Sequence, residues 1–145
     1  MIFKPHVPRD STVPALNFLR IHKLFPTSED RPKRMTDLPI EIDVKSVKSM
    51  LDSGDNFLLL DCRQPQEHQT AKIDGAMLIP MGEIPDRLSE IESFKTTKIV
   101  VHCHLGGRSL RVTEWLRSNG FEQTQNMTGG ITAWSQDVDP SVPQY

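Results

Sequence analysis

From residue 40 onward, short continuous apolar runs alternate with polar stretches of helical spacing. The segments 57–60 and 98–101 are the clearest runs, and each is flanked by polar residues. A short run that is apolar throughout is typical of a strand buried on both faces of a parallel sheet. The pattern therefore predicts an α/β domain with about five strands in a mainly parallel sheet and helices on both faces. Further strands are expected at 40–44, 76–79 and 124–127, and helices at 44–51, 65–71, 83–92 and 107–118.

The first 39 residues differ in composition from the rest of the chain. They contain six of the 11 prolines, and seven Lys and Arg against four Asp and Glu. Proline lacks a backbone donor and restricts φ, which disfavours long helices and central strands. We expect a basic, partly disordered extension over residues 1–39, one domain over 40–138 and a short tail over 139–145. The island 15–25 carries apolar residues at helical spacing, which leaves open a partner-docking helix or a single packed turn.

Charge and cysteine content narrow the partners and the compartment. The net charge of −2 indicates neither a nucleic acid nor an anionic membrane as a partner. Two cysteines are too few for a disulfide framework, which favours a reducing environment. No secretory signal or long apolar run is visible in the sequence. We therefore expect a cytoplasmic protein.

The segment His102–Ser109 places a cysteine at the end of a predicted strand, followed by two glycines and a predicted helix. A loop that opens a helix can direct backbone N–H groups toward one centre, where the positive end of the helix dipole also acts. Such surroundings stabilise a thiolate and make it a nucleophile. Cys103 is therefore the predicted catalytic residue.

Another predicted strand, 57–60, is followed by Asp61-Cys62-Arg63. In parallel α/β sheets, ligands bind beyond the carboxyl ends of the strands. If this strand is a parallel neighbour of 98–101, Arg63 lies near Cys103. A cation beside a nucleophile would bind an anionic substrate.

Four ordered motifs resemble the rhodanese-type sulfurtransferases, over roughly residues 40–138. The stretch FLLLDCRQPQEHQTAKIDGAMLIP, from residue 57 to 80, is similar to the first signature of that family. Residues 99–109 resemble its active-site loop, Gly120-Phe121 the turn after the next helix, and 129–134 its closing Gly-Gly-x-x-x-Trp element. The resemblance implies a rhodanese-like three-layer fold and sulfur transfer. The first 39 residues lie outside it.

Loop length separates two branches of that resemblance. Cys103 to Arg108 spans six residues, as in the sulfurtransferases. The related cell-cycle-type dual-specificity phosphatases carry one residue more, which widens the loop for a phosphate. The short loop favours a single sulfur atom over phosphate.

The resemblance implies a two-step reaction without a cofactor. Cys103 takes a sulfane sulfur from thiosulfate or a persulfide and passes it to cyanide, a thiol or a protein cysteine. The loop would hold the sulfur's charge, and Arg63 would bind the anionic end of the donor. Two alternatives stay open for Arg108, which either meets the substrate or forms an ion pair with Asp61 or Glu67. The predicted substrate-binding residues are Arg63, His104, Leu105, Gly106, Gly107, Arg108 and Ser109, with Gly106 and Gly107 both needed for the backbone angles of the loop.

Several neighbouring residues have a structural interpretation. We expect Asp61 and Glu67 to be structural, and Cys62 to point into the core rather than to form a disulfide with Cys103. His102 and His104 lack the spacing of a metal site, and no metal is expected. His104 is interpreted as a rim residue.

Leu105 departs from the pattern of thiosulfate-using members, several of which have a basic residue there. A persulfide is then a better donor than thiosulfate. One alternative function stays open, a non-catalytic rhodanese-fold module that regulates or docks a partner, which could bind through residues 1–39. A phosphatase or an arsenate-type reductase is disfavoured by the loop length.

Overall fold

A computed structural model of the protein describes residues 38–145. Five strands form one sheet with the order β1-β5-β4-β2-β3, and every neighbouring pair is parallel. The predicted α/β fold with a five-stranded sheet is confirmed. The strands are β1 (Glu41–Ile42), β2 (Phe57–Asp61), β3 (Met77–Leu78), β4 (Lys98–His102) and β5 (Thr124–Met127).

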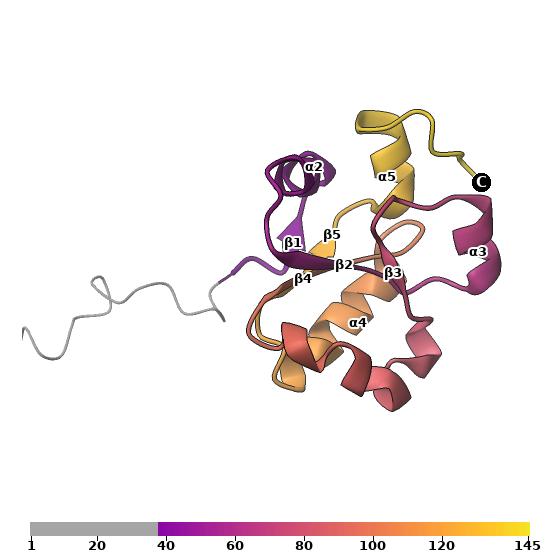
Figure 1. The fold of residues 1–145 in the computed structure, drawn as a ribbon. Coiled ribbons are helices and arrows are strands. Elements are labelled where there is room, and N and C mark those ends of the chain that lie inside the picture. Colours follow the sequence, from indigo (N-terminus) through magenta and orange to yellow (C-terminus); the bar gives the residue numbers. More distant parts are fainter. Residues whose placement is uncertain (1–37) are drawn as a thin grey trace, which may run out of the picture. The chain divides into compact units, whose positions relative to one another are not determined.

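Helices cover both faces of this sheet (Figure 1). In Figure 1, α2 and α5 lie on one side of the strands, and α4 lies on the other. A shorter helix, α3, follows β2 and lies near the end of the chain. The helices are α2 (Val44–Asp52), α3 (Pro65–Thr70), α4 (Gly107–Ser118) and α5 (Gly130–Asp137).

Successive residues of the two central strands belong to different hydrophobic clusters. Leu58 and Leu60 pack in the cluster that contains Leu116 of α4, whereas Leu59 packs with Trp134 of α5. Side chains alternate across a strand, so a run that is apolar throughout fills both faces of the sheet. This is the physical basis of the three layers.

The two central strands, β2 and β4, are parallel neighbours in the register Asp61 to His102. Their carboxyl ends therefore meet at one edge of the sheet. The segments after the two strands carry the candidate chemical residues, as predicted.

The segment predicted as a helix over 83–92 is three short 3₁₀ helices instead: η2 (Met81–Glu83), η3 (Pro85–Glu90) and η4 (Glu92–Phe94). Pro85 lacks the N–H that a continuous helix needs, and Arg87 adopts non-helical angles (φ −118°, ψ 18°). Ile84 and Ile91 are buried against the sheet. Ile84 and Ile91 therefore both reach the core although the segment between them is not one continuous helix.

The predicted domain ends at residue 138, but the following residues fold back onto it. Val142 is buried in the cluster on the α5 face, and its carbonyl accepts a 2.6 Å hydrogen bond from the Ser135 hydroxyl. At the other end, the carbonyls of Leu38 and Pro39 accept hydrogen bonds from Arg117. The predicted helical island at 15–25 lies outside the described residues. Within residues 38–145, no helix has the length and apolar character needed to cross a membrane.

Candidate active site

Cys103 follows β4 directly, and its thiol is buried under the loop that leads into α4. The backbone N–H of Gly106 lies 3.1 Å from Sγ, and the Ser109 hydroxyl oxygen lies 3.2 Å from it. Burial raises the pKa of the thiol. The Ser109 hydroxyl and the backbone N–H groups of Ser109, Gly106 and Leu105 outweigh this effect, so the pKa of Cys103 is lowered. The site therefore stabilises the thiolate more than the surroundings of a free cysteine do.

The two glycines of the loop have different roles. Gly106 has a φ of +109°, and a Cβ there would lie 3.4 Å from the Gly129 nitrogen. Gly107 has no positive φ, and a Cβ there would meet nothing within 4 Å. The expectation that the loop needs glycine at both positions is wrong, because only Gly106 requires the left-handed conformation.

The start of α5 supports the loop from behind. The N–H of Ile131 donates to the Cys103 carbonyl at 2.9 Å, and that of Thr132 donates to the His104 carbonyl at 3.2 Å. At Gly130, a Cβ would lie 2.6 Å from the Cys103 carbonyl oxygen. The Gly-Gly-x-x-x-Trp element, interpreted from sequence as a closing motif, thus packs its backbone directly on the loop.

Arg63 follows β2 and is fully buried, and all five of its N–H donors are used. Two donate to the Asp61 carboxylate at 2.9 and 2.7 Å, two to the carbonyls of Glu67 and Ala71, and one to the Tyr145 hydroxyl at 2.9 Å. The sequence predicted that Arg63 is open to the anionic end of a donor. In the structure the Asp-x-Arg spacing instead lets the neighbouring Asp61 carboxylate bind the guanidinium.

Arg108 lies at the start of α4 and forms a bidentate ion pair with Glu67, with both N–O distances 2.8 Å. Of the two partners left open, the structure thus pairs Arg108 with Glu67, and Asp61 with Arg63. The hydrogen bond from Arg108 lowers the pKa of Glu67 to about 2. Arg63 and Arg108 are therefore each neutralised by a carboxylate.

Two residues that the sequence analysis did not single out contact these groups. The Tyr145 hydroxyl donates to Glu67 at 2.9 Å, and its ring stacks on His104 with centroids 4.2 Å apart. Asn126, in the middle of β5, is buried and lies against Ser109. An amide within the predicted strand 124–127 was the one sequence signal for Asn126, whereas no local pattern indicated Tyr145.

The remaining candidate residues occupy different surroundings. Cys62 is buried, as expected, and burial raises the pKa of its thiol to about 12. His104 lies under the Tyr145 ring, and Leu105 is 65% exposed. Within residues 38–145, no cluster of three or more His, Cys, Asp or Glu side chains is arranged to hold a metal ion.

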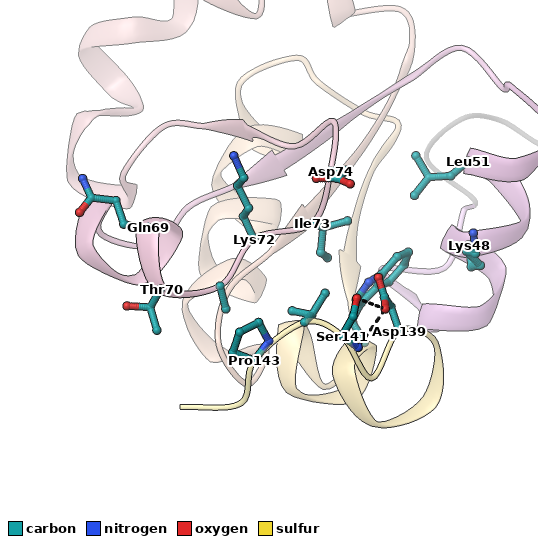
Figure 2. Close-up of a pocket in the computed structure, with 13 residues that line it drawn as sticks. Lys48, Leu51, Gln69, Thr70, Lys72, Ile73, Asp74, Asp139, Ser141 and Pro143 are labelled. Carbon is teal, nitrogen blue, oxygen red and sulfur yellow. Dashed lines mark hydrogen bonds between the residues drawn. The ribbon is translucent and has the colours of Figure 1, made fainter.

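A surface pocket of about 470 Å³ lies elsewhere, between α2, the segment after α3 and the tail (Figure 2). Lys72 and Asp74 line one side of it, Lys48 another, and Asp139 and Ser141 of the tail are hydrogen-bonded at its edge. None of the loop residues 103–109 lines it. This pocket therefore lies apart from the loop that surrounds the Cys103 thiol.

Comparison with known proteins supplies an independent result. The family described as rhodanese-like domain matches residues 43–137. A chloroplastic protein of Arabidopsis thaliana, rhodanese-like/PpiC domain-containing protein 12, is 35% identical over 132 residues, which cover 86% of this chain and 42% of that protein. A sulfurtransferase of Allochromatium vinosum is 36% identical over 102 residues, covering 70% of this chain and 94% of that protein.

Solved structures agree with the sequence relatives. The crystal structure of a rhodanese-like domain protein from Staphylococcus aureus superposes with a TM-score of 0.63 at 30% identity, covering 74% of this chain and 99% of that one. The chain spans less than half the length of the Arabidopsis protein, because the match covers 42% of that protein.

Proposed function

The chain belongs to the rhodanese-like domain family, and from this membership we propose that it is a sulfurtransferase in which Cys103 carries the sulfur as a persulfide. Family membership supports sulfur transfer in general, since a relative that matches along nearly its whole length is a sulfurtransferase. We propose in addition that Cys103 Sγ carries the sulfur, and we propose below which class of donor supplies it and which class of acceptor removes it.

One observation carries this proposal, namely the small set of donors around a single buried sulfur. Gly106 N–H and the Ser109 hydroxyl lie 3.1 and 3.2 Å from Cys103 Sγ. The loop places only four residues between Cys103 and Arg108. Preorganised donors of this kind stabilise a negative charge in a site from which water is excluded. A charge on sulfur, as thiolate or persulfide, fits a loop of this size.

The proposed reaction has two steps. In the first, the Cys103 thiolate attacks the outer sulfur of the donor, a new S–S bond forms, and the donor's own bond to that sulfur breaks. The donor leaves with the electron pair, as sulfite from thiosulfate or as a thiolate from a persulfide. In the second step, a thiol, protein cysteine or cyanide attacks the outer sulfur, and Cys103 leaves as the thiolate.

The charges near the loop support an organic or protein persulfide as the donor, rather than thiosulfate. All donors of Arg63 are used within the protein, and Arg108 is paired with Glu67. Leu105, which is 65% exposed beside Cys103, offers an apolar contact in place of a cation. Thiosulfate is a dianion and gains little electrostatic attraction from these paired cations. A persulfide depends less on such attraction, because the group that carries its sulfur has less negative charge.

Mass spectrometry after incubation with a glutathione persulfide or thiosulfate tests the proposal. Wild type and Cys62→Ser are expected to gain one sulfur on Cys103, while Cys103→Ser gains none. The Cys62 variant is the matched control, because Cys62 is buried and its pKa is raised to about 12. No sulfur uptake from either donor would overturn the proposal and favour the docking module.

Replacing Leu105 with lysine tests the choice of donor. A cation near the loop attracts thiosulfate by about 1 kcal/mol at a partly exposed site, so kcat/KM for thiosulfate is expected to rise about threefold to tenfold. Leu105→Gln serves as the uncharged control. Steady-state assays with cyanide as acceptor measure the effect, and a Leu105→Lys value equal to that of Leu105→Gln would contradict this account of specificity.

A further inference from the structure

A row of polar groups runs from the Cys103 thiol, through the buried Ser109 and Asn126, to the exposed Glu41 of the edge strand β1. The Ser109 hydroxyl oxygen lies 3.2 Å from Cys103 Sγ and 2.5 Å from Asn126 Oδ1. The Asn126 Nδ2 group lies 2.9 Å from Glu41 Oε2 and 3.2 Å from the Gly106 carbonyl oxygen. The row thus joins the loop, α4, β5 and β1.

The partners of Asn126 determine how its amide is oriented. Glu41 contributes a carboxylate oxygen and Gly106 a carbonyl oxygen, and both are acceptors. The NH₂ group must face them, which turns Oδ1 toward Ser109. Because an amide oxygen only accepts, the Ser109 hydroxyl must donate in this contact.

A hydroxyl has a single proton, so Ser109 cannot donate to Asn126 and to Cys103 at the same time. While it donates to Asn126, its oxygen offers a lone pair to the sulfur, which suits a neutral thiol that donates its own proton. A thiolate needs the opposite arrangement, in which Ser109 turns its proton to Sγ and leaves Asn126 Oδ1 without a donor.

We propose that Asn126 is a positioning residue that competes with the Cys103 thiolate for the Ser109 proton, and thereby sets how strongly Ser109 holds charge on Sγ. The consequence for turnover rests on the proposed sulfur transfer. When a persulfide forms, the charge moves from Sγ to the outer sulfur, and Ser109 can return its proton to Asn126. The hydroxyl then follows the charge through the cycle, while the N–H of Gly106 remains directed at the sulfur.

Asn126 has a second effect that the test must separate from the first. Its NH₂ group holds the Gly106 carbonyl, so its removal also loosens the loop and the N–H donor of Gly106. A looser loop changes the pKa of Cys103 whether or not the Ser109 hydroxyl is present. The competition for the Ser109 proton changes it only when that hydroxyl is present. The other titratable or charged groups around Cys103 are unchanged in the test: Cys62, Arg108 with its partner Glu67, Glu41 beyond Asn126, and the flanking His102 and His104.

A double-mutant cycle in the full chain isolates the competition. Wild type, Ser109→Ala, Asn126→Leu and the double variant are alkylated with iodoacetamide across a pH series, and mass spectrometry locates the adduct on Cys103. The pH midpoint of alkylation is compared with and without Asn126 in each background. Asn126→Leu is expected to shift this midpoint downward by about half to one pH unit more when Ser109 is present than in the Ser109→Ala background. Equal shifts in the two backgrounds would make Asn126 purely structural and overturn the inference.

A second measurement needs no change at Asn126, in case Asn126→Leu does not fold. The side-chain NH₂ resonances of Asn126 are followed by NMR as Cys103 titrates. They are expected to shift at the Cys103 midpoint in wild type and to stay constant in Ser109→Ala. A shift of the same size in both proteins would contradict the role of Ser109. Neither readout uses a sulfur donor, so failure of sulfur uptake would count against the proposed function alone.

Discussion

At the scale of single residues, His102 shows how the sheet controls the chemistry next to the thiol. The imidazole is fully buried beneath the loop, and within the described residues its Nε2 atom has no hydrogen-bond partner. Burial lowers the pKa of His102 to about 4, although the Asp61 carboxylate 4.0 Å away acts in the opposite direction. The residue beside Cys103 is therefore a neutral histidine at physiological pH, and not a cation that stabilises the thiolate.

This histidine makes the stability of the fold depend on pH. In the unfolded chain it binds a proton near pH 6.5, whereas in the folded protein it does so only near 4. Between these values the unfolded state binds more protons, so stability is full above pH 6.5 and falls as the pH drops toward 4. His102→Leu removes this contribution.

We therefore expect the free energy of unfolding of wild type to fall, between pH 7 and pH 5, by about 2 kcal/mol more than that of His102→Leu. Urea denaturation of both proteins at the two pH values measures the difference. Other titrating groups are common to both proteins and cancel. Parallel pH dependence in the two proteins would show that His102 is protonated in the folded state.

At the scale of elements, the hydrogen bonds between α5 and the loop after Cys103 join residues that lie 28 positions apart in the sequence. The first N–H groups of a helix lack partners within the helix. Here the N–H groups of Ile131 and Thr132 are satisfied by the carbonyls of Cys103 and His104. The helix thus gains hydrogen bonds at its start, and the loop gains a rigid support.

Gly130→Ala is expected to break this contact. Gly130 has a φ of +59°, which a side chain resists, and its Cβ would lie 2.6 Å from the Cys103 carbonyl oxygen. We expect a loss of about 2 kcal/mol or more in unfolding free energy, together with reduced sulfur uptake. Urea denaturation and mass spectrometry measure the two effects.

Gly107→Ala is the matched control, because the same methyl group there meets no atom within 4 Å and needs no positive φ. Its stability is expected to stay within about 1 kcal/mol of wild type, since alanine favours a helix. A Gly130→Ala protein as stable and active as Gly107→Ala would mean that α5 does not support the loop.

At the scale of the whole molecule, the end of the described chain closes one side of the site. Val142 anchors the tail in the core, and Tyr145 then reaches Arg63 and Glu67, 82 and 78 residues away in sequence. The Tyr145 ring also stacks on His104 of the loop. The tail therefore links the segment after β2 with the segment after β4.

Tyr145→Phe tests this link by removing only the hydroxyl. Arg63 and Glu67 each lose one hydrogen bond, and water replaces part of them because Tyr145 is 42% exposed. We expect the unfolding free energy to fall by about 1 kcal/mol, and hydrogen exchange in the tail to become faster. Gln144→Ala, an exposed neighbour, serves as the control. If Tyr145→Phe and Gln144→Ala have the same unfolding free energy and the same hydrogen-exchange rates in the tail, the Tyr145 hydroxyl does not link the tail to Arg63 and Glu67.

The sequence alone indicated the α/β class, the parallel sheet and the position of Cys103 between a strand and a helix. The apolar runs at 57–60 and 98–101 indicate strands that are buried on both faces of the sheet. Cys103, the two glycines and the helix that follows are consecutive in the sequence. These features follow from neighbouring residues, whose spacing directly reflects backbone geometry. The helix bounds at 107–118 and the strand bounds at 124–127 were accordingly predicted without error.

Only the tertiary structure decided which partners each side chain has. It gave all of the Arg63 donors to groups inside the protein, brought Tyr145 onto the loop and set Asn126 against Ser109. The contacts of Ser109 with Asn126 and of Arg63 with Tyr145 join residues that are 17 and 82 positions apart. Local spacing does not encode them, because they depend on how the layers pack and on which buried donors must find acceptors.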